Sequence, residues 1–418
     1  MLTALKGNIL EALSPDTLGI HPNSYLVLED GRVAGIYPVL PDNITEAQVE
    51  DFGDALILQS FADMHLHGPQ DEFMGTGMDR PLLQWLDTYA FPTEARYANI
   101  DYAREKYRIL AHDLIQNGTT RVCMFSSLHT DATLILMEEL EKAGVTGYVG
   151  KVNMDRNAPP YLCETTEESE RETLRWLEKC KRFTLVKPIL TPRFAPSCSP
   201  ELLSFLGKLK EERDLPVQSH LSENTGEIAL VAQLFPDCRQ YWEVYDKYGL
   251  FDSKTLMAHC VHSDRRERAA MRMRGVHPVH CASSNNSLMS GISPVADMLQ
   301  EGQAVCLGSD VSGGTTLSML HTMANSINAS KDRGSMKQDM SQAISIEQAY
   351  YMATGAGQAF LGHGIGLKEG ESLHAIVLDD TGLPKLPNIT LRERLLRAVY
   401  RLDDRHIRAV YSEGIRRL

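Results

Sequence analysis

The chain of 418 residues lacks any long apolar run. None of its apolar stretches approaches the roughly 20 residues that a helix needs to cross a bilayer. No basic start leads into an apolar core of the kind that marks a secretory signal. These absences predict a cytoplasmic protein without a membrane span.

Cysteine pairs and clusters of positive charge are also missing. The eight cysteines are scattered and form no C-x-x-C pair, which predicts reduced and mostly buried thiols. Asp and Glu outnumber Lys and Arg by 55 to 42, so the formal net charge is −13. Because phosphate binding depends on clustered Lys and Arg, this balance argues against nucleic acid as a partner. The basic stretch 392–408 contains Glu393, Asp403 and Asp404, which is typical of a solvated helix face.

Three catalytic patterns are absent as well. The chain has no G-x-x-x-x-G-K-[ST] loop, no G-x-S-x-G elbow, and no H-x-E combined with P-C-x-x-C. These absences argue against a phosphate-binding loop, a serine nucleophile at an elbow and a zinc site of the cytidine deaminase type.

Short alternating apolar and polar runs occupy both ends of the chain. In residues 24–39, Asp30-Gly31 stands between two such runs and indicates a hairpin. A similar block, E-G-E-S-L-H-A-I-V-L-D, opens the last part of the chain. We predict a small β-sandwich domain built from both termini, over residues 1–57 and 368–418.

The middle of the chain alternates strand and helix patterns. One helix is expected to begin after Ser199, with Pro200 in its first turn. Eight strand–helix alternations predict an α/β protein with a (β/α)8 barrel of the TIM type as the catalytic domain, over residues 58–367. A doubly wound sheet is the alternative. The candidate strands are residues 55–62, 119–125, 146–152, 183–190, 215–220, 255–259, 276–281 and 304–310.

Histidines and a carboxylate stand where four of these strands should end. His65 and His67 follow the first strand, His220 ends the fifth, His259 ends the sixth and Asp310 closes the eighth. A metal ion that activates water needs imidazoles and a carboxylate that point from several strands into one cavity. In a barrel these strand ends converge on one mouth, whereas in an open sheet they lie along an edge. The sequence therefore predicts a metal site.

The spacing of these residues indicates which role each one has at the metal site. His65 and His67 lie two residues apart on a strand, so their side chains share a face. Glu223, three residues after His220, can place an acid/base group beside the water. Asp310 can hold the metal and also accept a proton.

Other polar residues of these segments are given different roles. His259 is expected either to bind the metal or to hydrogen-bond to its water and to the substrate. His262 and His280 are interpreted as supporting or structural residues. Lys187 lies several residues before its strand ends at Thr191, too deep to bridge two metals, so a single metal is predicted.

These segments together resemble the amidohydrolase superfamily, and the sequence that flanks them resembles its guanine deaminase branch. The matching segments are H-L-H-G-P-Q, L-L-Q-W-L-D-T-Y-A-F-P-T-E, N-G-T-T, V-K-P-I-L-T-P-R-F, Q-S-H-L-S-E-N and D-D-R-H-I-R-A-V-Y. The resemblance covers almost the whole chain. Family members usually read P-G where this chain has Gln59-Ser60, and H-C-P-x-S-N where it has H-C-A-S-S-N. Neither departure removes a metal ligand.

The resemblance implies one zinc ion per chain, with iron as an alternative because it accepts a similar ligand set. The implied metal ligands are His65, His67, His220 and Asp310. The implied substrate-binding residues are His67, Gln70, Arg193, Phe194, His220, Glu223 and Asp310. The guanidinium of Arg193 is a good hydrogen-bond donor to a purine carbonyl, and the side-chain amide of Gln70 can form hydrogen bonds with the edge of the purine ring. Phe194 or Trp85 can pack against the face of the ring.

The resemblance also implies an activity, the hydrolysis of guanine to xanthine and ammonia. The expected catalytic residues are Glu223, His259 and Asp310. Zinc-bound hydroxide attacks C2 of guanine, Glu223 carries a proton to ring N3, and Asp310 accepts one from the water. The implied setting is purine catabolism by a cytoplasmic homodimer whose partner is the small purine substrate.

Two alternatives remain at this point. A sibling aminohydrolase would act on another purine, a pterin or a triazine. Arg193 and Gln70 argue against a substrate that has no carbonyl beside its amino-bearing ring, because a buried arginine would be left unpaired. A non-catalytic relative would have kept the barrel and lost the chemistry, but this chain retains every ligand and the acid/base residue.

Overall fold

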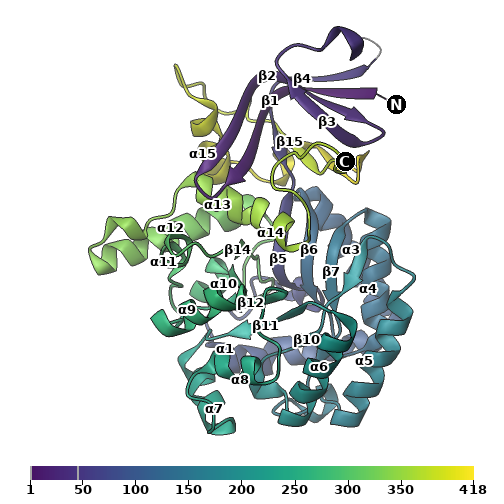
Figure 1. The fold of residues 1–418 in the computed structure, drawn as a ribbon, viewed down its shortest axis with the longest axis vertical. Coiled ribbons are helices and arrows are strands. Elements are labelled where there is room, and N and C mark those ends of the chain that lie inside the picture. Colours follow the sequence, from purple (N-terminus) through teal and green to yellow (C-terminus); the bar gives the residue numbers. More distant parts are fainter. Residues whose placement is uncertain (1, 45–46) are drawn as a thin grey trace.

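Strands from both ends of the chain form one sheet. In the computed structural model, which describes residues 2–44 and 47–418, seven strands lie in the order β17-β16-β15-β4-β1-β2-β3. Figure 1 shows this sheet at one end of the molecule, where both chain ends lie. Its strands are β1 (Leu2–Ser14), β2 (Thr17–Glu29), β3 (Arg32–Tyr37), β4 (Gln48–Gln59), β15 (Ala375–Leu378), β16 (Ile407–Ser412) and β17 (Ile415–Arg416).

The two halves of this terminal sheet meet where β4 pairs with β15. The pairing is antiparallel, with Gln59 opposite Ala375. The predicted hairpin is confirmed, since Glu29 pairs with Arg32 and the turn residues Asp30 and Gly31 have positive φ angles of 49° and 77°. The described strands form one continuous sheet, so a sandwich of two sheets is not confirmed.

The apolar run over residues 55–62 belongs to two strands rather than one. Residues 55–59 form the C-terminal end of β4 in the terminal sheet, and β5 (Phe61–His67) begins after Ser60. The prediction of a single strand was wrong because the run stays apolar across the break. Both parts are buried, one in each sheet, so composition does not change where the chain leaves the terminal sheet.

The body of the molecule contains two four-stranded parallel sheets, ordered β5-β6-β7-β9 and β11-β12-β13-β14, and a β8–β10 pair. Each of the eight predicted segments contains a strand, which confirms the α/β class. Besides β5, the strands are β6 (Thr119–Phe125), β7 (Thr146–Gly150), β8 (Val152–Asn153), β9 (Val186–Pro188), β10 (Thr191–Pro192), β11 (Val217–Leu221), β12 (Thr255–His259), β13 (His277–His280) and β14 (Cys306–Leu307).

Short backbone contacts join the two parallel sheets at both edges. On one side, Leu190 and Val217 form an isolated bridge. On the other side, the Asp310 N–H donates to the His65 carbonyl at 2.8 Å, and the His67 N–H donates to the Val311 carbonyl at 3.0 Å. The ladders of the described strands do not form one closed barrel.

Helices lie outside the parallel strands, as Figure 1 shows for α3 to α6. The predicted cap is present, since the Ser199 hydroxyl accepts from the Leu202 N–H at 3.0 Å and Pro200 opens α6. The helices are α1 (Leu82–Trp85), α2 (Phe91–Ala95), α3 (Ile100–Gln116), α4 (Thr130–Ala143), α5 (Thr166–Cys180), α6 (Pro200–Arg213), α7 (Thr225–Leu234), α8 (Tyr241–Lys247), α9 (Arg265–Arg274), α10 (Ala282–Ser287), α11 (Val295–Gln300), α12 (Met319–Lys337), α13 (Ile346–Ala353), α14 (Gly355–Phe360) and α15 (Leu391–Arg401).

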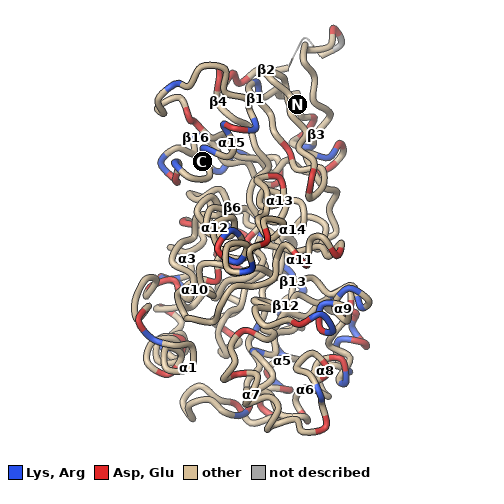
Figure 2. The backbone as a smooth tube through the Cα atoms, turned by 90° about the vertical axis from the view of Figure 1, so that its left-hand side faces the viewer, with Lys and Arg blue, Asp and Glu red and all other residues tan. Residues whose placement is uncertain are grey.

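Acidic and basic residues are spread along the whole chain (Figure 2). The basic stretch 392–408 contains all of α15 except its first residue, and it is not entirely the solvated face that its sequence indicates. Arg394 is buried, and its guanidinium donates to the carboxylates of Asp54 and Asp380. These partners lie elsewhere in the sequence, so the local charge pattern could not predict them.

All eight cysteines are unpaired, and six of them are buried. Within residues 2–44 and 47–418, no helix combines the length and apolar character that a bilayer span needs.

A buried hydroxyl stabilises the contact between the terminal sheet and the body. The Tyr350 side chain on α13 accepts from the Gln59 N–H at 2.9 Å and donates to the Leu10 carbonyl at 3.3 Å. We expect Tyr350→Phe to lower the free energy of unfolding by about 1–3 kcal/mol, because two buried backbone groups lose their partner. Calorimetry should show a lower Tm.

The matched control is Tyr400→Phe. The Tyr400 hydroxyl donates to Asn328 from an exposed position, so its loss should change stability by less than about 0.5 kcal/mol. Equal Tm values for the two variants would contradict the structural role of Tyr350.

Candidate active site

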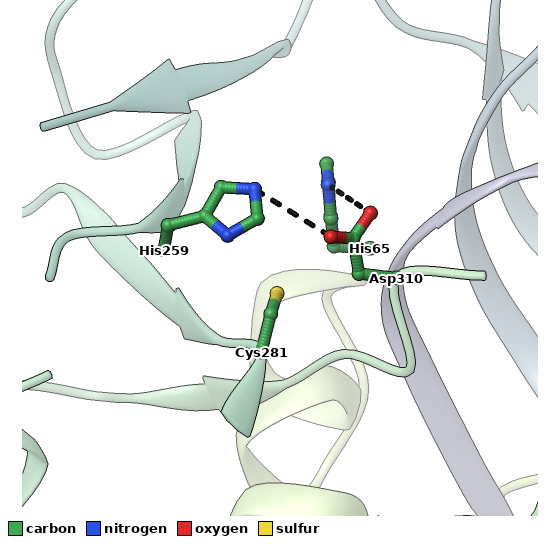
Figure 3. A group of neighbouring side chains, drawn as sticks. All are labelled: His65, His259, Cys281 and Asp310. Atoms are coloured by element: carbon green, nitrogen blue, oxygen red, sulfur yellow. Dashed lines mark ion pairs between the residues drawn. The ribbon is translucent and has the colours of Figure 1, made fainter. Parts of the chain in front are cut away.

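The ends of β5, β11 and β12 and the segment after β14 bring the predicted metal ligands together. His65 Nε2 lies 3.2 Å from Asp310 Oδ1, and His67 Nε2 lies 3.6 Å from the same oxygen. His67 Nε2 is 3.2 Å from His220 Nε2. His259 Nε2 is 3.7 Å from Asp310 Oδ2, and Figure 3 shows His65 and His259 both directed at Asp310. All five side chains are buried.

These separations suit a bound metal ion. Donors about 2.0–2.1 Å from a tetrahedral zinc lie about 3.3–3.4 Å from one another. The buried Nε2 of His65 has no hydrogen-bond partner in the described structure, so a metal ion would satisfy it. Two overlapping groups of donors are close enough to hold an ion among the described residues. One is His65, His67 and His220, and the other is His65, His259, Cys281 and Asp310.

Two of the histidines are held by carbonyl oxygens on their outer side. His220 Nδ1 donates to the Arg193 backbone carbonyl at 2.5 Å, and His259 Nδ1 donates to Asn285 Oδ1 at 2.9 Å. A carbonyl oxygen can only accept, so when either ring is neutral its proton lies on Nδ1. The Nε2 lone pair of each ring therefore faces the cluster, as a metal ligand requires.

The electrostatics of the cluster keep these groups in their ligating forms. Burial raises the pKa of Asp310, but the imidazoles of His65 and His259 outweigh burial and hold it below its ordinary value. Burial lowers the pKa of His67 and of His220 well below 6.5. A metal ion needs neutral imidazoles and an ionised carboxylate, and the pKa directions of His67, His220 and Asp310 favour that combination. Burial lowers the pKa of His259, but the carboxylates of Glu223 and Asp310 outweigh burial and raise it above its ordinary value.

The backbone is strained where these side chains enter the cluster. Ser222, His259, Cys260 and Asp310 have φ angles of 48°, 71°, 48° and 50°, in the left-handed region that residues with a Cβ rarely adopt. All four follow or end strands of the same parallel sheet. Such strain persists where the surrounding structure imposes it, and it concentrates at functional sites.

Glu223 lies beside the cluster, where the sequence predicts an acid/base group. Its Oε2 is 3.6 Å from His259 Nε2, and its Oε1 accepts from the Ser290 hydroxyl at 3.3 Å. Burial raises the pKa of Glu223, so its carboxyl binds a proton more readily than a solvated one. The Glu227 carboxylate accepts from the backbone N–H groups of Glu223 and Asn224 at 3.0 and 3.2 Å, which holds this turn in place.

A pocket opens over the cluster. Its polar residues come from both halves of the α/β body, and Trp85, Phe194 and three leucines supply flat apolar walls. All seven predicted substrate-binding residues lie on it. The lining residues are His67, Gln70, Leu82, Trp85, Leu86, Arg193, Phe194, His220, Glu223, His259, Leu288, Asp310 and Gly313.

The remaining predicted residues lie outside this set. His262 Nε2 bonds to the Ser290 carbonyl at 2.9 Å, which fits a supporting role. His280 is buried, and burial lowers its pKa to about 4, which favours its neutral form. Lys187 on β9 is exposed.

Sequence reasoning missed three residues that contact the site. Asn285 holds His259, Cys281 lies among the second group of donors, and buried Glu94 pairs with Arg193. Cys281 directly follows the seventh strand, so its position at a strand end was an available signal. Glu94 ends the family-like segment L-L-Q-W-L-D-T-Y-A-F-P-T-E and Asn285 ends H-C-A-S-S-N, so the resemblance pointed to both segments, but only the fold shows which partners the two side chains meet.

Comparison with known proteins places this arrangement in a family. The model of the family described as "Amidohydrolase family" matches residues 56–415. Guanine deaminase of Dictyostelium discoideum is 33% identical over 99% of this chain and 98% of its own length. Guanine deaminase of Rattus norvegicus is 38% identical over 84% of this chain and 78% of its own.

Solved structures agree with the sequence comparison. The crystal structure of guanine deaminase from C. acetobutylicum, with guanine bound in its active site, superimposes with a TM-score of 0.96. It is 43% identical and covers 100% of both chains. With its donor cluster beneath a flat-walled pocket, the chain belongs to the amidohydrolase family and, within it, to the guanine deaminases.

Proposed function

We propose that this protein hydrolyses guanine to xanthine and ammonia. The observation that carries the proposal is a cluster of buried imidazoles and a carboxylate at the base of a pocket whose polar wall includes Gln70 and Arg193. The 43% identical relative holds guanine in its active site, and it superimposes over the whole chain.

The cofactor we propose is a single zinc ion held by His65, His67, His220 and Asp310, with iron as the alternative. Three imidazoles and one carboxylate suit either metal. When bound, the metal lowers the pKa of water to about 7, so a nucleophile is available at neutral pH.

The chain's own residues bind and orient the purine. Arg193 and Gln70 donate to the ring carbonyl, and Phe194 and Trp85 cover the faces of the ring. The amino-bearing carbon C2 then faces the donor cluster. Because the walls are apolar, bulk water is kept away from the reacting atoms.

Proton transfer is the task of three residues around the attacking water. Asp310 accepts a proton from the water, and Glu223 delivers a proton to ring N3, which makes C2 a better electrophile. Asp310 then passes its proton to the amino group, Glu223 takes a proton from the new C2 hydroxyl, and the C2–N bond breaks to give ammonia and the C2 carbonyl of xanthine. His259 lies within 4 Å of both carboxylates and orients the water between them. Overall, guanine and one water give xanthine and ammonia.

The larger architecture is proposed in the same way. The two parallel sheets and their edge contacts support a (β/α)8 barrel over residues 58–367, with a small domain from residues 1–57 and 368–418. The resemblance to guanine deaminases supports purine catabolism, a cytoplasmic location and a homodimer as the setting of the enzyme.

The proton-transfer role of Glu223 can be tested by substitution. We expect Glu223→Gln to slow ammonia release from guanine by about 10² to 10⁴, because the amide has similar shape and cannot shuttle the proton. The metal content should stay at the parent value. The measurement is the steady-state rate of ammonia release, with Glu212→Gln on α6 as an exposed control.

A Glu223→Gln variant that keeps the parent rate would contradict the role of Glu223 in proton transfer. A folded, metal-replete parent that releases no ammonia from guanine would instead favour the sibling aminohydrolases, and the same assay would then be run with other purines, pterins and triazines.

The ligand set is tested by counting metal ions. We expect one ion per chain in the parent, loss of activity after removal with a chelator, and recovery when zinc is returned. His220→Ala should lower the metal content well below one ion per chain, because it removes one of the four proposed ligands. Elemental analysis of the purified proteins gives the stoichiometry.

Cys281→Ser is the matched control for this set. Cys281 belongs to the second group of donors and not to the proposed ligands, so this variant should retain one ion per chain. Loss of the ion from Cys281→Ser with retention in His220→Ala would show that the other group is the true ligand set.

A further inference from the structure

A buried carboxylate, Glu94, joins the two polar residues of the pocket wall. Arg193 Nη1 donates to Glu94 Oε2 at 2.5 Å and Arg193 Nη2 donates to Oε1 at 2.9 Å, which is a bidentate pair. Gln70 Nε2 donates to the same Oε1 at 2.8 Å. The Glu94 side chain is 1% exposed and does not line the pocket, so it contacts the purine only through its two partners.

The local sequence explains where Glu94 sits. It belongs to α2, in which Pro92 opens the first turn and Phe91 lies beneath the guanidinium of Arg193, 5.1 Å from it. The aromatic ring and the carboxylate therefore hold Arg193 from two directions. Arg193 itself follows β10, on the opposite side of this contact.

The hydrogen bonds around Glu94 leave only N–H donors of Gln70 and Arg193 free to face the pocket. Gln70 Oε1 is already occupied, because it accepts from the Ser312 N–H at 3.1 Å. This bond and the bond to Glu94 fix which way the Gln70 amide points. Both carboxylate oxygens of Glu94 are occupied as well. The free groups of Gln70 and Arg193 are therefore N–H donors.

We propose that Glu94 is a positioning residue that makes the enzyme selective for a purine with a ring carbonyl at this wall. A carbonyl accepts from the free donors of Arg193 and Gln70, whereas an amino group would meet donors with its own N–H groups. Glu94 also neutralises Arg193, so an uncharged ring binds without leaving an unpaired buried cation. This inference rests on the proposed function, because it assumes that the purine occupies this pocket.

Removing the charge of Glu94 should relax this selectivity. In Glu94→Gln the new amide can donate as well as accept, so the Gln70 amide is no longer held in one orientation. Gln70 Oε1 can then turn toward the pocket and accept from a ring amino group. Glu94→Asp keeps the charge and both acceptor oxygens, so it should keep the preference for a carbonyl.

The test compares guanine with 2,6-diaminopurine, which has an amino group in place of the carbonyl. The measurement is kcat and KM for ammonia release from each substrate by the parent, Glu94→Gln and Glu94→Asp. We expect the ratio of kcat/KM for guanine to that for 2,6-diaminopurine to fall by about tenfold or more in Glu94→Gln. In Glu94→Asp the ratio should stay within about threefold of the parent.

A control separates this effect from general destabilisation. Glu164 also pairs with a buried cation, since its Oε2 lies 2.9 Å from the Nζ of Lys151, and neither residue lines the substrate pocket. Glu164→Gln should leave the substrate ratio at the parent value even if its Tm falls. Should Glu94→Gln not fold, the double variant Arg193→Met with Glu94→Met removes both members of the pair and takes its place.

The outcomes separate this inference from the proposed function. A parent that is inactive with guanine overturns both. An active parent, with a ratio that stays at the parent value in Glu94→Gln or in the double variant, overturns only the role of Glu94. A common fall in kcat/KM for both substrates gives that unchanged ratio, and it is the result expected of a merely structural carboxylate.

Discussion

The site depends on the backbone hydrogen bonds that join the end of β5 to the segment after β14. Asp310 N donates to the carbonyl of His65, and His67 N donates to that of Val311. Each bond links a metal-ligand candidate of one parallel sheet to the edge of the other sheet. The cluster therefore forms only when both sheets have folded and met, and the pocket above it depends on the same contact.

Buried carboxylates stabilise the segments that surround this contact. The Asp63 carboxylate accepts from the backbone N–H and the hydroxyl of Ser309, and burial raises its pKa to about 7. Glu227 holds the turn that carries Glu223, and Glu94 holds Arg193. Burying such groups is costly unless each is paired. The arrangement thus gives up stability in order to hold the side chains of the site in place.

The sequence predicted the parts of the site that are local. His65 and His67 lie two residues apart on one strand, and His220, His259 and Asp310 each end a predicted strand, so periodicity and strand order were enough. Glu94 was missed because its partner Arg193 lies 99 residues away. The family-like segment that ends at Glu94 gave no sign of that pairing. The boundary between β4 and β5 was missed because burial on both sides of Ser60 keeps the run apolar.

The pairing of β4 with β15 has a consequence for how the protein is made. The chain leaves the ribosome from its N-terminus, so β4 is synthesised long before its neighbour, and the catalytic body emerges in between. Until β15 arrives, one edge of β4 has no partner and is open to pairing with other chains. A truncated product would therefore carry a nearly complete active site together with an exposed, apolar strand edge. Such a fragment would be prone to pair with other chains, and the last strands remove that hazard by covering the edge.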